Sequence, residues 1–250
     1  MILRSITCHV RDQNWFAVGI DFVIVVAGIL IAFQITNWAA ARQDSMLYEQ
    51  ARSRVIEEAN TNRVLAQNAI SRVVDQRNRI LGILRDFASC SAADGAEETF
   101  MRTMQTLRLI VSLDVRSDAI KHILTSDAFL DNISPEDRGT FSDYLRTVDN
   151  VADNSRFSDS FFGSRLQPQD NPIFQRTLDG GFSGDLIRLA LTVSYEQACQ
   201  DTTLNQFLFD RLENGAYINY LAERLAQASL ELLTGLGESP SETPKAESAP

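Results

Sequence analysis

The sequence contains few of the residues from which most metal and redox sites are built. It has only three cysteines and two histidines in 250 residues. His9 lies in the N-terminal tail, so His122 is the one histidine left for the rest of the chain, and we expect it on a helix surface. No Cys-x-x-Cys or His-Glu-x-x-His spacing occurs. We therefore predict no metal site and no cofactor.

Motifs for phosphate binding and for nucleophilic catalysis are lacking as well. No glycine-rich loop matches a phosphate cradle. The run Gly181-Phe182-Ser183-Gly184 approaches the Gly-x-Ser-x-Gly elbow, but Asp185 stands where the last glycine is required. The pairs Glu57-Glu58 and Glu97-Glu98 are consecutive, so on a helix their carboxylates point about 100° apart and are expected to be solvated. A cysteine beside His122 could in principle act as a nucleophile, but nothing in the spacing favours it. We predict that the chain is not an enzyme.

Lysine is almost absent, since only Lys121 and Lys245 occur and arginine supplies the other basic residues. The formal net charge is -10, and the acidic excess lies after residue 88. Nucleic-acid binding needs a basic face that displaces counterions, so a nucleic-acid partner is excluded. An acidic domain is also repelled by anionic lipid, and we expect it to stand off a membrane surface.

One long apolar run is present near the N-terminus. It reads WFAVGIDFVIVVAGILIAFQITNW from Trp15 to Trp38, with no charge between Phe22 and Phe33. As a helix it would extend roughly 35 Å, which exceeds the hydrocarbon core of about 30 Å. A tryptophan at each end suits the headgroup level, so Trp15 and Trp38 are predicted interfacial anchors. We predict a transmembrane helix over residues 15–38, with the lipid bilayer as its surroundings.

Two other interpretations of this run were weighed. A buried core helix of this length would have a polar face, and this run has none. A signal peptide cleaved near Ala39-Ala40-Ala41 is the other alternative, but its apolar region would span only about 7–15 residues.

The orientation of the helix is not decided by arginine counting, because arginines flank both ends. A tail of fourteen residues before a long apolar run is the layout of a signal-anchor. Cys90 and Cys199 lie on the domain side of the run, and Cys8 lies on the other. An outward-facing domain could pair Cys90 with Cys199, whereas the alternative is two buried thiols that never meet. We predict a bacterial inner-membrane protein with a cytoplasmic tail at residues 1–14 and a periplasmic domain at residues 39–236.

One face of the predicted span is distinctive. At about 100° per residue, Asp21, Gly28, Ala32 and Ala39 fall on a narrow stripe. Gly28 and Ala32 form a small-xxx-small pair that allows a second helix to approach closely. A carboxylate such as Asp21 is costly in lipid and usually faces protein or water. We predict an interface between membrane helices here; the alternative is that Asp21 reaches the headgroup level and Gly28 is incidental.

The same segment resembles a family of uncharacterised bacterial single-pass membrane proteins with a domain of unknown function. The resemblance covers about the first 45 residues and is most specific in Gln34-Ile35-Thr36-Asn37-Trp38, after an acidic residue near the start of the span. A weaker likeness extends over residues 123–145 through Arg138 and Tyr144. Ala39 departs from the pattern, in which an asparagine is common. The resemblance implies membrane insertion and orientation, and no activity.

The remainder of the chain is predicted to be helical. Apolar residues recur at steps of three and four from Asp44 to Phe87, which indicates one long amphipathic helix continuing from the span, with its arginines on a solvated face that pairs with acids such as Glu57 and Glu58. Ser134-Pro135 followed by acids marks the start of a helix that should end near Phe161. Further helices are expected over residues 97–114, 117–130, 185–198 and 203–236. No strand is predicted, because the alternation in Val111–Val115 sits inside a helical pattern.

These patterns predict an all-α fold: one N-terminal transmembrane helix, a long amphipathic helix and an irregular helical bundle, followed by a disordered tail at residues 237–250. The expected function is that of a structural or protein-interaction module that associates with itself or with a protein partner through the span. The alternatives are an extracytoplasmic ligand-binding sensor and an accessory subunit of a larger membrane complex.

Overall fold

The computed structural model describes residues 15–90, 95–107, 111–130, 132–163, 170–178 and 187–239 of the chain. Its fold is all-α apart from one short hairpin, which confirms the predicted fold class. The predicted tail at residues 1–14 and most of the predicted disordered tail lie outside the described residues. Residues 237–239 are described, and Glu238 lies 3.8 Å from Arg52, measured from Oε1 to Nη1.

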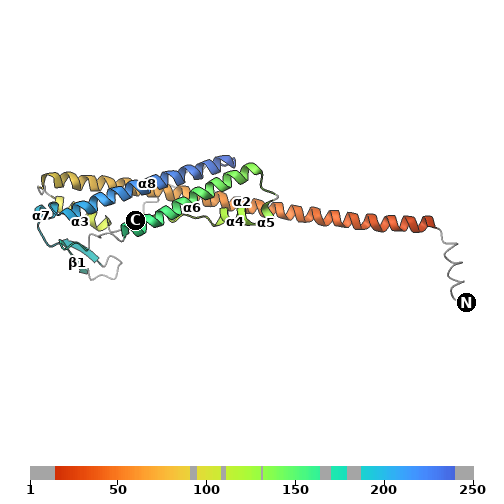
Figure 1. The fold of residues 1–250 in the computed structure, drawn as a ribbon, viewed down its shortest axis with the longest axis horizontal. Helices are drawn as coiled ribbons and strands as arrows, with labels where there is room; N and C mark the ends of the chain where they lie inside the picture. The colour runs from red at the N-terminus through yellow and green to blue at the C-terminus, as the bar shows by residue number, and fades with distance from the viewer. Residues whose placement is uncertain are drawn as a thin grey trace.

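The long helix α2 runs without interruption over Trp15–Ser89. Its 75 residues correspond to a rod of about 110 Å. Figure 1 shows the first part of this rod standing free of the rest of the protein and the second part lying within the bundle. Among its described side chains, which begin at residue 19, the first buried one is Tyr48. The apolar run therefore continues directly into the amphipathic helix, as the sequence predicts.

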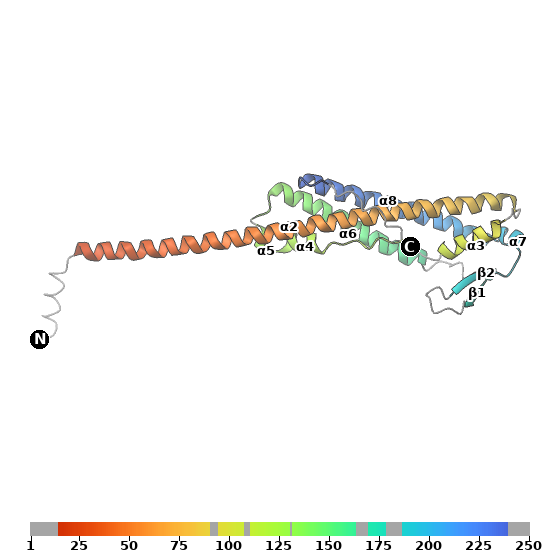
Figure 2. The ribbon, with the colours of Figure 1, turned by 180° about the vertical axis from the view of Figure 1, so that it is seen from behind.

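The bundle is formed by α2 with α6 (Pro135–Gly163) and α8 (Thr202–Gly235). The three helices lie side by side in both views (Figures 1 and 2). Helix α8 is antiparallel to α2, since Arg52 donates to the Leu236 carbonyl near one end and Gly215 faces Val73 further along. It is also antiparallel to α6, because Tyr217 bonds Asn154 and Asn214 bonds Ser158.

The core of the bundle is divided into two clusters along its length. The cluster nearer the free part of α2 joins residues from Tyr48–Val73 to α6 and to the second half of α8, and it includes Val55, Tyr144 and Leu225. The distal cluster surrounds Ile80, Phe100 and Leu208. Between them the packing is polar: Arg211 and Asn214 are both buried.

Two predicted helices between α2 and α6 are corrected by the structure. The helix expected over residues 97–114 is shorter: α3 spans Ala96–Leu107, and residues 111–117 are not helical. Leu113 in this segment is buried, and its N–H donates to Ser155 Oγ at 2.9 Å, so the segment packs against α6 without forming a helix. The helix expected over residues 117–130 is two short ones, α4 (Asp118–Thr125) and α5 (Asp127–Leu130).

The prediction of no strand and of a helix over residues 185–198 is wrong. Strands β1 (Phe174–Leu178) and β2 (Ile187–Leu191) form an antiparallel hairpin in which Phe174 pairs with Leu191. Leu189 is buried while Arg188 is exposed, so the alternation typical of a strand was the missed signal. Of the described residues in that range, those from Tyr195 on are helical and form α7 (Tyr195–Cys199), and Ser194 and Gln197 close its capping box.

Candidate functional site

The free part of α2 is long enough and apolar enough to cross a membrane, judged by length and composition alone. None of its most apolar window is buried in the protein. Large apolar side chains are exposed all around it, among them Phe22, Val23, Ile24, Val25, Ile29, Leu30, Ile31, Phe33 and Ile35. This free surface rules out the alternative of a buried core helix for the described chain.

The predicted interface residues Asp21, Gly28 and Ala32 are all exposed on this free part. No protein atom would lie within 4 Å of a Cβ added at Gly28. In an ideal helix, residues 27 positions apart lie on opposite faces. Tyr48 and Val55, which are buried in the bundle, stand 27 positions after Asp21 and Gly28. The stripe thus points away from the side of α2 that packs the domain, so a second helix could reach it unobstructed.

The predicted anchor Trp38 is also exposed, at the end of the apolar run. The guanidinium carbon of Arg42 lies 5.6 Å from the centroid of its ring. This cation–π contact places a charge one helical turn beyond the ring, at the level where apolar side chains give way to polar ones. The side chain of the other anchor, Trp15, lies outside the described residues.

Cys90 and Cys199 form a disulfide, with their Cα atoms 5.8 Å apart. Cys90 directly follows α2 and adopts a positive φ of 45°, while Cys199 ends α7. The rings of Phe87 and Tyr195 pack nearby, 5.8 Å apart. The sequence left open whether Cys90 and Cys199 are paired or are two separate buried thiols. In the structure they are paired, and the disulfide joins the distal end of α2 to the end of α7.

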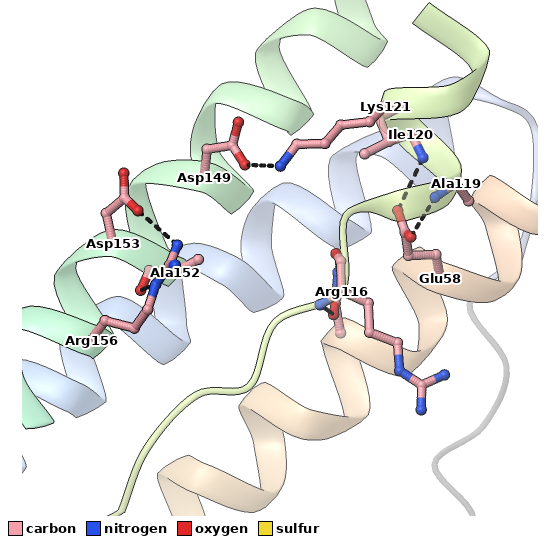
Figure 3. Close-up of polar contacts among 10 residues, drawn as sticks. Glu58, Arg116, Ala119, Ile120, Lys121, Asp149, Ala152, Asp153 and Arg156 are labelled. Carbon is pink, nitrogen blue, oxygen red and sulfur yellow. Dashed lines mark hydrogen bonds and ion pairs between the residues drawn. The ribbon is translucent and has the colours of Figure 1, made fainter.

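A polar clamp on α2 was missed by the sequence interpretation. Asn62 is almost fully buried, and its side chain makes two hydrogen bonds to the backbone of Arg116. Its Nδ2 donates to the Arg116 carbonyl at 2.7 Å, and its Oδ1 accepts from the Arg116 N–H at 2.9 Å. One turn earlier, the Glu58 carboxylate accepts from the N–H groups of Ala119 and Ile120 at 2.8 and 3.2 Å. Figure 3 shows this carboxylate pointing from α2 into the first turn of α4.

The expectation that Glu58 belongs to a solvated face is therefore wrong. Glu58 is 7% exposed, whereas the neighbouring Glu57 is exposed. The N-cap residue of α4, Ser117, makes no side-chain cap, so Glu58 supplies the missing acceptor from another helix and its charge suits the positive end of α4. The signal in the sequence was position: Glu58 lies three residues after Val55 and four before Asn62, within the buried stripe.

A cleft of about 380 Å³ opens beside this clamp, between α2 and the start of α4. Its lining includes Arg54, Glu57, Glu58, Arg116, Asp118 and His122. His122 is exposed, as predicted, and its ring lies edge-on to Phe129 at 5.5 Å. The lining holds no cluster of metal ligands, and none was found elsewhere in the described part of the chain.

Burial raises the pKa of the Glu58 carboxyl above its ordinary value, and the charge of Asp118 adds to this, although the bonds from α4 act in the opposite direction. A carboxyl whose pKa is raised by folding stabilises the protein most below its unfolded pKa of about 4.3, and this contribution is lost as the pH rises through the folded value. We expect the stability advantage of the wild type over Glu58→Gln to be largest near pH 4 and to shrink towards pH 7.

Denaturant titrations of the detergent-solubilised chain at several pH values would measure this difference. Glu57→Gln is the matched control, since it makes the same substitution at the adjacent position, where the side chain is exposed. An advantage over Glu58→Gln that grows between pH 4 and pH 7 would contradict the assignment.

Comparisons of the chain with models of protein families, with curated proteins and with solved structures found no match. The resemblance carried by Gln34–Trp38 stays a prediction. The run Gly181–Gly184 lies outside the described residues.

Proposed function

We propose that the chain is a single-pass membrane protein whose helical domain serves as a structural or protein-interaction module outside the cytoplasm. The observation that carries this proposal is the free apolar half of α2, which no part of the described protein covers. Exposing so much apolar surface to water costs roughly 25 cal/mol for each Å², whereas lipid covers it without cost. The ending Gln34–Trp38 further suggests kinship with the bacterial family named above.

The disulfide supports the orientation. Structural disulfides persist in oxidising compartments such as the bacterial periplasm and are rare in the cytosol. The Cys90–Cys199 bridge lies in the domain beyond the span. A domain on the periplasmic side of an inner membrane, with the N-terminal tail in the cytoplasm, is consistent with this chemistry.

Two other roles are each favoured by one observation. Asp21 favours an accessory subunit of a larger complex, because a carboxylate in a span is stabilised by a polar partner on another helix. The charged cleft between α2 and α4 favours a ligand-binding sensor. The interaction module is preferred because the stripe of Asp21, Gly28 and Ala32 points away from the domain and is open to a partner helix.

A pair of glycine substitutions tests the proposal. Gly28→Leu fills the stripe and prevents close approach of a second helix, and we expect it to weaken association in mild detergent about tenfold, the equivalent of about 1.4 kcal/mol. Gly19→Leu is the control, because residue 19 lies nine positions earlier and on the opposite face of an ideal helix. Neither glycine has a protein atom near its absent side chain, so neither change should disturb folding.

Size-exclusion chromatography with light scattering, and mass spectrometry of copurifying proteins, would measure the association. The proposal requires an assembly in the wild type and in Gly19→Leu that dissociates in Gly28→Leu. A wild type that purifies alone as a monomer, or two variants with equal association, would refute it.

A further inference from the structure

The cleft between α2 and α4 presents both signs of charge on each of its walls. Arg54 and Glu57 lie on the α2 wall, and Arg116 and Asp118 lie on the opposite wall. All four residues are exposed. Within the described part of the chain, none of the four side chains takes part in an ion pair or a side-chain hydrogen bond. Four charges that meet in one cleft without neutralising one another are available to a ligand.

The two walls are held at a fixed spacing by the clamp. Asn62 fixes the backbone of Arg116 through two hydrogen bonds, and Glu58 fixes the first turn of α4 through two more. Figure 3 shows the guanidinium of Arg116 beyond this anchored backbone, with no marked contact of its own. Glu58 is satisfied by α4 and so supports the cleft instead of contacting a ligand. A preorganised cleft avoids much of the ordering cost of binding.

The chemistry of the four groups defines the ligand class. Guanidinium groups bind carboxylates through paired, charge-assisted hydrogen bonds, and carboxylates accept hydrogen bonds from an ammonium group. A ligand that uses both kinds of group carries a carboxylate and an ammonium group. The cleft volume of about 380 Å³ falls at the lower end of the range for small-molecule sites, about 300–1,000 Å³.

We infer that this cleft binds a short peptide through its two charged ends, with Arg54 and Arg116 on the C-terminal carboxylate and Glu57 and Asp118 on the N-terminal ammonium. This site goes beyond the role of a membrane tether and does not depend on it. Binding can be measured on the solubilised full-length chain, whatever its topology or its association through the span.

Titration calorimetry with trialanine in three forms tests the site: both ends free, the N-terminus acetylated, and the C-terminus amidated. The free peptide should bind saturably, and each blocked form should bind at least about tenfold more weakly, because each loses charge-assisted hydrogen bonds at one end. Arg54→Gln should weaken the free peptide by a similar factor and should reduce the difference between it and the amidated form, because only Arg116 is then left to contact the carboxylate.

Arg72→Gln is the matched control, since Arg72 is an exposed arginine on the same helix outside the cleft, bonded only to the Asn68 carbonyl one turn back. It should leave the affinity unchanged. The absence of saturable binding, equal affinity for the three peptides, or an equal effect of Arg54→Gln and Arg72→Gln would each overturn the assignment.

Discussion

Replacing Cys90 and Cys199 together by serine should lower the free energy of unfolding by about 2–5 kcal/mol. The two cysteines are 109 residues apart in sequence, so the bridge closes a long loop in the unfolded chain. Closing a loop lowers the entropy of the unfolded state, and in the chain-entropy model the resulting stabilisation of the folded state increases with loop length. The loss should concentrate in the distal half of the bundle, where the bridge joins the end of α2 to α7. Denaturant titration of wild type and variant under identical detergent conditions measures the difference.

Cys8→Ser is the control, because it removes a cysteine that is not in the bridge and should leave stability unchanged. Treating the wild type with a reductant should reproduce the effect of the double substitution. A change below about 0.5 kcal/mol, the usual effect of a neutral surface substitution, would mean that the bridge does not stabilise the domain.

Placing two arginines in the middle of the apolar run should release the chain from the membrane. Val25 and Leu30 are both exposed on the free part of α2, so neither change should disturb the bundle. On the scale for insertion of helices, each arginine near the centre costs about 2.5–3.5 kcal/mol, and each also removes a favourable apolar residue. Val25→Arg with Leu30→Arg should therefore shift the chain from the membrane fraction to the soluble fraction.

The matched control places the same two charges on the domain. Phe157 and Phe209 are exposed aromatic residues in α6 and α8, and changing both to arginine should leave the chain with the membrane. Cell fractionation and immunoblotting compare the two variants. Equal retention of both would show that something other than the apolar run attaches the chain.

The sequence was most informative where the decisive interactions are local. The apolar run and the three- and four-residue steps after it predicted α2 because helical periodicity depends on neighbours only. The start of α6 was likewise predicted from Ser134 and Pro135, and the structure confirms it: the Asp137 N–H donates to Ser134 Oγ at 3.0 Å.

The features that the sequence did not yield depend on contacts between distant residues. Glu58 is buried only because the start of α4, some 60 positions later, brings two N–H groups to it. The non-helical segment at residues 111–117 is held in place because Asn62 and Ser155 supply hydrogen-bond partners from two other helices. Periodicity places Glu58 and Asn62 in the buried stripe of α2, but it does not identify the residues that they contact, so the clamp and the cleft do not follow from the sequence.

The hairpin of β1 and β2 shows a different limit. The stretch from Ile187 to Leu191 is compatible with either a helix or a strand when considered alone. The choice is made by pairing with β1, in which Arg176 faces Leu189, and by burial of Leu189 in the distal cluster. For a short, largely apolar run close to glycines, both a strand and a helix should therefore be considered.

The most direct test follows the unaltered full-length chain through a wash of isolated membranes in alkaline carbonate. Because the free half of α2 is dissolved in lipid on this account, the chain should stay in the pellet at full length and leave it only when detergent is added. Recovery of the intact chain in the carbonate supernatant would mean that the helix is not in the bilayer, and the proposal of a membrane-anchored module would fall with it.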